Sequence, residues 1–161
     1  EVDMKKWVII FLTISSLSFS LLMNISNYKI IENSLYNYDK KIENVDIETF
    51  ETVGLCCAKD KNNVYFGDDV VKDIDAKTFI KISGKNDSLY YRDKKNIYFA
   101  EVNGLIVIKG ADLDSFIVYD MITAGDENNK YFRATKLTDK DSIKDWNKRK
   151  KIIEDGGMFP M

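Results

Sequence analysis

Residues 60–66 read DKNNVYF, residues 93–99 read DKKNIYF, and residues 126–132 read DENNKYF. The three copies start 33 residues apart and share their first Asp, their fourth-place Asn, their Tyr and their Phe. Recurrence at a fixed period is the signature of one small structural unit that is used several times. The sequence therefore predicts a repeat protein, and this heptapeptide defines the repeat.

The heptapeptide predicts a tight turn followed by a strand. In a β-hairpin closed by a type I turn and a bulge, a short acceptor side chain suits the first turn position and a residue tolerant of positive φ suits the fourth. Asp60 and Asn63 fit these positions, because the short polar side chain of Asn makes the left-handed conformation tolerable. The strand that follows would place Val64 and Phe66 on one face and Tyr65 on the other.

A second motif recurs in phase with the first. It consists of Asp, two variable residues, Thr or Ser, and Phe, at residues 46–50, 75–79 and 112–116. An Asp three residues before a hydroxyl residue predicts a capped turn, and the Phe that follows predicts an anchor in the core. Residues 35–50 align on residues 64–79 without a gap, so the first unit lacks only its leading turn. In the longer unit that follows, Asn103-Gly104 predicts an extended hairpin that leaves the core intact.

With both motifs in phase, the chain resembles the bacterial DKNYY family, which takes its name from the repeated heptapeptide. The resemblance covers about residues 35–132 and is carried by DKNNVYF and DKKNIYF, each preceded by a Lys or Arg. In the third copy, Glu127 and Lys130 depart from the pattern. The resemblance implies an exported bacterial protein whose biochemical role is not established, and it assigns no catalytic or ligand residues to this chain.

The N-terminus predicts export. Lys5 and Lys6 precede an apolar run at residues 7–23 that contains no charge. Such a run predicts a signal peptide, or a membrane anchor if it is not cleaved, and Ser18-Phe19-Ser20 is a candidate cleavage site. In both cases the Lys pair holds the N-terminus inside and directs the remainder across the membrane.

The chain divides into four predicted regions. They are a hydrophobic helix within a signal or anchor at 1–26, a linker at 27–34, β repeats at 35–135, and a helix with a tail at 136–161. Within the repeats, strands are predicted at Leu55–Ala58, Val64–Phe66, Leu89–Arg92, Ile97–Ala100, Leu105–Ile108 and Ile117–Tyr119. Because consecutive strands are close in sequence, we expect a mainly β fold, an antiparallel meander of tandem hairpin units of about 30 residues.

The C-terminal region predicts a helix that caps the repeats. Ile143, Trp146 and Ile153 recur at helical spacing, which predicts a helix from Ser142 to Glu154. Thr138 or Asp139 can cap its start, and Gly156-Gly157 ends it. Terminal units of repeat proteins commonly need such a cover.

Composition excludes several function classes. The net charge of −2 argues against a nucleic-acid-binding domain, which is usually basic. The chain contains no His, which removes the usual catalytic triads and most zinc sites. The segment that starts at Asp60 lacks the Gly and Glu that an EF-hand loop requires at its sixth and twelfth positions, where Tyr65 and Val71 stand. We therefore predict neither a metal nor a cofactor.

Three sets of polar residues admit a chemical interpretation beside a structural one. Cys56 and Cys57 lie on a predicted strand, which would point their side chains to opposite faces. The outward one could form an intermolecular disulfide, but plain core and surface positions are favoured. Paired carboxylates could serve a hydrolase, but Asp is also common at turns and caps; the pairs are Asp68 with Asp69, Asp112 with Asp114, and Asp139 with Asp141. The basic run 148–151 could bind an anionic partner, although cations at a helix end also offset the helix dipole.

The strongest candidate binding residues are Tyr65, Tyr98 and Tyr131, which repeat at one spacing. They could form an exposed aromatic stripe that binds a peptide or glycan, or they could pack in cross-strand pairs. We expect an exported, non-enzymatic binding or envelope protein, with an unknown protein or glycan partner and no nucleic acid. The alternative is a small envelope hydrolase that uses paired carboxylates.

Overall fold

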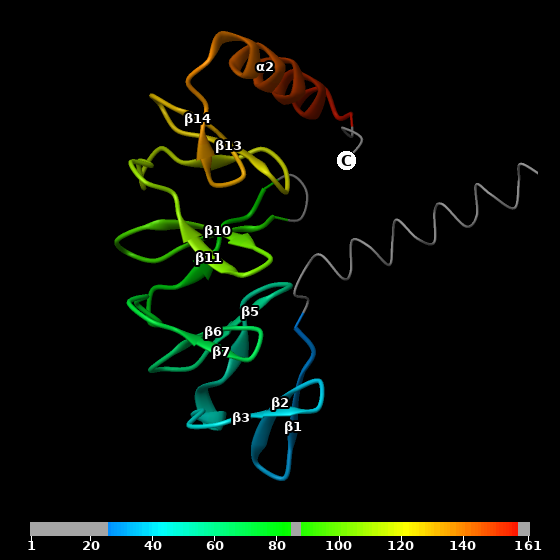
Figure 1. Cartoon of the computed structure of the whole chain (residues 1–161), viewed down its shortest axis with the longest axis vertical. Helices are drawn as coiled ribbons and strands as arrows, with labels where there is room; N and C mark the ends of the chain where they lie inside the picture. Colours follow the sequence, from blue (N-terminus) through cyan, green and yellow to red (C-terminus); the bar gives the residue numbers. More distant parts are fainter. Residues whose placement is uncertain (1–25, 85–87, 158–161) are drawn as a thin grey trace, which may run out of the picture.

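The computed structural model describes residues 26–84 and 88–157. These residues form four antiparallel sheets and one C-terminal helix, α2 (Lys140–Glu154). In Figure 1 the sheets lie one above another along the long axis of the molecule, with the first sheet at one end and α2 at the other. The predicted mainly β class and the C-terminal helix are confirmed. The predicted N-terminal helix lies outside the described residues.

Each sheet is built from consecutive strands of the chain. The first contains β1 (Tyr28–Ile31), β2 (Ser34–Asn37) and β3 (Lys40–Ile42). The second contains β4 (Glu51–Thr52), β5 (Cys57–Lys59), β6 (Val64–Phe66) and β7 (Asp69–Val71). The third contains β8 (Ile80–Lys81), β9 (Tyr90–Arg92), β10 (Ile97–Glu101) and β11 (Gly104–Val107). The fourth contains β12 (Ile117–Val118), β13 (Thr123–Gly125), β14 (Lys130–Phe132) and β15 (Thr135–Lys136).

The described strands form separate sheets rather than one continuous sheet. The second motif lies at each junction, where the chain leaves one sheet and starts the next. Between the first two sheets it forms a short 3-10 helix, η1 (Ile47–Thr49), whose N-cap Asp46 accepts a hydrogen bond from the backbone N–H of Thr49. The capped turn predicted from this motif is therefore present, and it ends each sheet before the next strand begins.

All six strands predicted from the sequence are present, with ends that differ by at most two residues. The predicted linker at 27–34 is wrong, because β1 occupies residues 28–31 and pairs with β2. Glu32 and Asn33, with φ of 48° and 60°, form the two-residue turn between these strands. Positive φ at both central residues is the requirement of a type I′ hairpin turn, which Asn satisfies at low cost.

The extended hairpin predicted at Asn103-Gly104 is present, but its two turn residues are Val102 and Asn103, one residue earlier than predicted. β10 has five residues where β6 has three, and Glu101 pairs with Gly104 across the turn. Gly104 has a φ of +135°, a conformation that glycine adopts more readily than other residues. The added residues extend the hairpin outward, and Ile97 and Phe99 remain in the core.

The core lies between the sheets, and each internal sheet contributes both of its faces to it. Leu35 and Ile42 of the first sheet pack with Ala58 and Tyr65 of the second. Val64 and Phe66, on the opposite face of β6, belong to a larger cluster that continues through the third and fourth sheets. The predicted alternation of Val64 and Phe66 against Tyr65 is thus confirmed, but all three side chains are buried.

Helix α2 packs against the fourth sheet. Asp139 accepts a hydrogen bond from the N–H of Ser142 as its N-cap, and Gly156 follows its end with a φ of +85°. The indole N–H of Trp146 donates to the carbonyl oxygens of Ala124 and Tyr131, both at 3.1 Å. In the described part of the chain, no helix combines the length and the apolar character needed to span a membrane.

Candidate functional site

The first Asp of each heptapeptide holds its turn together through one carboxylate. In the second copy, Asp93 accepts hydrogen bonds from the backbone N–H groups of Lys95 (2.7 Å) and Asn96 (2.8 Å). Its other oxygen accepts from the Tyr98 hydroxyl at 3.0 Å and from the N–H of Asp75 at 3.0 Å. Four donors therefore converge on one carboxylate that is only 2% exposed.

The first and third copies repeat these four contacts at equivalent positions. The carboxylates of Asp60 and Asp126 accept from the tyrosine hydroxyls of Tyr65 and Tyr131 at 2.6 and 2.8 Å. The remaining donors are the backbone N–H groups of Asn62, Asn63 and Asp46 in the first copy and of Asn128, Asn129 and Asp112 in the third. The third copy keeps this geometry although its sequence departs from the pattern, and β14 pairs with β13 and β15.

These contacts control the protonation of the three turn acids. Burial alone would raise the pKa of Asp93, but its hydrogen bonds outweigh burial and lower the pKa below the usual value. The pKa values of Asp60 and Asp126 are lowered in the same way. The three carboxylates are therefore held in the charged form by the turns that they organise.

One detail of the predicted turn is wrong. Six described non-glycine residues have positive φ, and neither Asn63 nor Asn96 is among them. The Asn is instead used for its donors: its backbone N–H reaches the Asp carboxylate, and the side-chain amide of Asn96 lies 3.2 Å from the Tyr98 hydroxyl. The Asp side chain closes the turn in this arrangement, so the left-handed conformation is not required.

The predicted tyrosine stripe is not exposed. Tyr65, Tyr98 and Tyr131 are buried, and each donates its hydroxyl to the Asp of its own turn. Each ring also packs near the Phe of the second motif, with ring centroids 6.1 Å apart for Phe50 and Tyr65 and 5.6 Å apart for Phe116 and Tyr131. The tyrosines therefore link the two motifs inside the core, and a binding role that needs their surface is wrong.

The hydroxyl residue of the second motif completes this link. The Thr78 hydroxyl accepts a hydrogen bond from the N–H of Lys94 at 3.0 Å, and the Lys94 ammonium forms an ion pair with Asp75. Thr49, Lys61 and Asp46 make the same contacts in the first copy, with an ion pair of 2.5 Å. In the third copy, Glu127 replaces the Lys, so only the contact from its N–H to the Ser115 hydroxyl is kept, at 3.3 Å.

The two cysteines lie on the same side of the chain, contrary to the prediction. Their sulfur atoms are 4.0 Å apart, and both side chains are buried. β5 begins at Cys57, so Cys56 precedes the strand and does not follow its alternation. The Tyr91 hydroxyl lies 3.5 Å from the Cys56 sulfur, and burial raises the pKa of the Cys57 thiol. Both cysteines therefore occupy core positions, and the environment of Cys57 disfavours the reactive thiolate.

The carboxylate pairs are dispersed, and one member of each makes a structural contact. Asp68 accepts from the Asn37 side-chain amide at 2.6 Å and pairs with Lys40 at 3.0 Å. Asp112 accepts from the N–H and hydroxyl of Ser115, and Asp139 caps α2. The described residues contain no group of three or more His, Cys, Asp or Glu side chains arranged to hold a metal ion.

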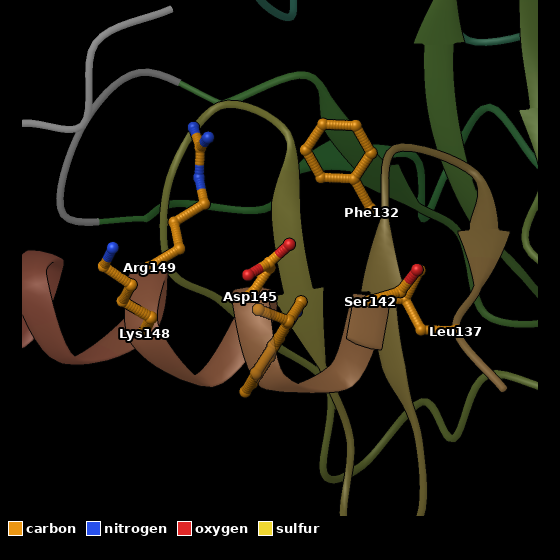
Figure 2. Close-up of a pocket in the computed structure, with 7 residues that line it drawn as sticks. Phe132, Leu137, Ser142, Asp145, Lys148 and Arg149 are labelled. Carbon is orange, nitrogen blue, oxygen red and sulfur yellow. The ribbon is translucent and has the colours of Figure 1, made fainter. Parts of the chain in front are cut away.

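A groove with a cavity of about 440 Å³ runs between α2 and the last sheet, and the sequence interpretation did not predict it. Figure 2 shows its lining residues, which come from β14, the chain after β15, and one side of α2. They are Phe132, Leu137, Ser142, Asp145, Trp146, Lys148 and Arg149. With Asp145 as its single acid, this groove does not bring together the two carboxylates that the hydrolase alternative requires.

The basic run of α2 is divided between structural and exposed positions. Arg149 bonds the Asp120 carboxylate through two nitrogens, at 2.8 and 2.7 Å, and both side chains are largely buried. The Lys150 ammonium lies over the Tyr119 ring at 5.0 Å and pairs with Glu154 at 3.6 Å. Lys148 and Lys151 are exposed. The run thus anchors the helix through two residues and leaves two for solvent or a partner.

The sequence profile of the DKNYY family matches residues 2–102. The chain belongs to the DKNYY family. The matched range contains the first two heptapeptides of this DKNYY protein, and the third, at 126–132, forms the same turn outside that range. No curated protein and no solved structure matches the chain.

Proposed function

We propose that this DKNYY-family chain is an exported, non-enzymatic scaffold, built from tandem units of about 30 residues, that presents a binding surface outside the cytosol. Support for the scaffold comes from the repeated residues themselves. The Asp, Asn, Tyr, Thr or Ser, and Phe that define the repeat all face one another inside or between the turns. Residues that recur in all three copies and contact one another serve to hold the fold together. A binding surface is therefore expected among the residues that differ between the copies or lie outside them.

Support for export comes from the sequence. The apolar run at residues 7–23 follows two lysines, which is typical of a signal peptide or an N-terminal anchor. A protein outside the cytosol has less access to chaperones and must keep its fold without them. A series of turns, each closed by one carboxylate with four donors, is suited to that demand.

The test is the location and N-terminus of the full chain in bacterial cells, followed with a C-terminal tag. Recovery from the envelope or medium with Leu21 as first residue indicates cleavage, and recovery from the membrane with Lys5 and Lys6 retained indicates anchorage. An Ile14→Arg variant, which interrupts the apolar run, should remain in the cytosol, whereas the matched Lys29→Arg control should be exported. Cytosolic recovery of the unaltered chain would refute the export proposal.

A further inference from the structure

The last sheet leaves exposed a residue that the earlier sheets bury. Phe132 ends the third heptapeptide and is 40% exposed, whereas Phe66 and Phe99, at the same place in the first two copies, are 5% and 0% exposed. Phe66 and Phe99 lie in the core shared with the sheet that follows. No sheet follows β15 among the described residues, and α2 covers the last face only in part.

The groove beside α2 is the uncovered part of that face. Phe132, Leu137 and Trp146 form its apolar walls, and Trp146 is fixed in place by its two hydrogen bonds to the sheet. Figure 2 shows Phe132 across the groove from α2, with Asp145 and Arg149 rising from the helix toward the same side. A recess with aromatic and aliphatic walls and a polar edge is suited to one large apolar side chain of a partner.

On the side of α2 that borders this recess, three lysines outnumber the two acids, Asp141 and Asp145. The Arg149 charge is compensated by Asp120, and its guanidinium lies 6.0 Å from the centroid of the Phe132 ring. Lys148 forms no ion pair with any described residue, and Lys144 and Lys151 lie one turn before and after it on the same side of α2. A stripe of lysines therefore borders the apolar recess and favours an acidic partner.

We propose that this groove binds an extended acidic peptide segment of a partner protein, with an aromatic side chain in the recess and flanking carboxylates on the lysines. The proposal rests on the scaffold function and names its partner. A polymer of phosphates has no apolar group for the recess, and a membrane surface suits protruding rather than recessed apolar side chains. A second copy is disfavoured, because the outer face of the first sheet carries Lys29 and Lys41 beside Tyr36 and would oppose like charges.

The test uses the full chain and the defined probe Ac-Glu-Glu-Phe-Glu-Glu-NH₂. Two matched control probes replace its Phe with Gly, or its four Glu with Lys. Binding is followed by two-dimensional NMR through the indole N–H signal of Trp146, with fluorescence anisotropy of labelled probes for affinity. We expect saturable binding of the acidic aromatic peptide, and at least tenfold weaker binding of both control peptides, because each lacks one of the two complementary features.

Two variants assign the binding to the groove. Phe132→Ala removes the recess wall and should weaken binding about tenfold, as loss of a central aromatic contact commonly does. Lys148→Glu should weaken it severalfold at low salt and less at high salt, because exposed charges are screened. The matched controls are Ile117→Ala, at another exposed apolar residue of the same sheet, and Lys109→Glu, at an exposed lysine of another unit. Both should bind like the unaltered chain.

Several results would overturn the peptide proposal. They are no binding of the acidic probe, equal binding of the Gly or Lys probe, or binding that Phe132→Ala does not change. Binding of phosphatidylglycerol vesicles in a manner that depends on Phe132 would replace the peptide with a lipid surface, and Phe132-dependent self-association in sedimentation would replace it with a second copy. If the chain is exported but does not bind the peptide, the peptide proposal fails and the scaffold function is retained. If the chain is not exported, the proposed function and the peptide proposal both fail.

Discussion

At the scale of single residues, the repeat depends on one carboxylate that collects four donors. Asp93 is surrounded by two N–H groups of its own turn, the Tyr98 hydroxyl, and the N–H of Asp75 from the second motif. The last of these contacts joins the two motifs across 18 residues of sequence. Replacing this acid should therefore affect both the turn and the junction between sheets.

Asp93→Asn should destabilise the protein by about 2 kcal/mol near pH 7, because its amide nitrogen would face donors where an oxygen now accepts. The pKa of the Asp93 carboxyl is lowered in the folded state. The stability that the charged carboxylate provides is therefore complete above the unfolded pKa of about 3.9 and is lost as pH falls through the folded pKa. The stability difference between Asp93→Asn and the unaltered chain should thus shrink below pH 4. Urea unfolding at several pH values measures it, with the exposed Asp69→Asn as control. An unchanged difference at low pH would contradict this account.

Tyr98→Phe isolates the hydroxyl contact. Its loss should cost about 1 kcal/mol at pH 7, the usual net value of one buried hydrogen bond. Burial and the neighbouring Asp93 raise the pKa of Tyr98 to about 12, so the stability that the hydroxyl provides is complete below the unfolded pKa of about 10 and is lost as pH rises toward 12. The difference between variant and unaltered chain should decrease over that range. Tyr36→Phe, at the equivalent position on the outer face of the first sheet, should have little effect at any pH.

At the scale of elements, each heptapeptide contacts the second motif that precedes it in the chain. We call this set of contacts a clip, because it joins one sheet to the next. In the first two copies an ion pair completes it, between Lys61 and Asp46 and between Lys94 and Asp75. In the third copy Glu127 stands in place of the lysine, so this ion pair cannot form there. The third clip therefore retains its hydrogen bonds and lacks its charge pairing.

Glu127→Lys should stabilise the protein slightly, because it restores the ion pair with Asp112 that the other copies contain. The gain should be small and should disappear in high salt, since both groups are exposed and screened. Thermal unfolding at low and high salt measures it, with Lys94→Glu as the reverse substitution. A lower melting temperature for Glu127→Lys at low salt would show that the third clip differs from the others in more than charge.

The attachment of α2 depends on a buried ion pair as well as on Trp146. Arg149→Ala should destabilise the protein by about 3 kcal/mol, because it leaves the Asp120 carboxylate largely buried without its cation. Lys148→Ala, one residue earlier and exposed, is the matched control and should change stability little. Urea unfolding monitored by circular dichroism gives both values. Equal effects of the two substitutions would contradict an anchoring role for Arg149.

At the scale of the whole molecule, each sheet depends on its neighbours for burial. The third sheet has neighbours on both faces, whereas the outer face of the first carries Lys29, Tyr36 and Lys41. Stability in such a stack is the sum of unit and interface terms, so units at the ends open more readily than those between them.

Amide hydrogen exchange should reveal this gradient in the unaltered chain. The slowest exchange is expected in β9 and β10, which are covered on both faces, and faster exchange is expected in β1 and β3 at the end of the stack. The reason is that local opening of an end sheet breaks one interface instead of two. Uniform protection across all four sheets would show that the molecule opens only as a whole.

Local features of this fold could be predicted from the sequence because their causes are local. The 33-residue period, the strand after each turn, the Asn103-Gly104 hairpin and the ends of α2 depend on residues close together in the chain. The turn conformation at Asn63 was wrong because the Asp60 side chain could close the turn without a left-handed residue. The shared side of Cys56 and Cys57 was missed because the strand begins at Cys57, two residues later than its apolar run.

The sequence by itself determined that a short unit recurs, that it is built of strands and turns, and that a helix follows the last copy. Only the tertiary structure decided which side chains remain at the surface. A strand pattern cannot distinguish a sheet with one covered face from a sheet with two, so Tyr65, Tyr98 and Tyr131 fitted an exposed stripe as well as a core. Stacking of the sheets buried all three tyrosines. Phe132 occupies the same position of the heptapeptide as Phe66 and Phe99, but it lies at the end of the stack and borders an open groove. The burial of a residue depends on which element packs over it in the folded chain, and the residues near it in sequence do not specify that element.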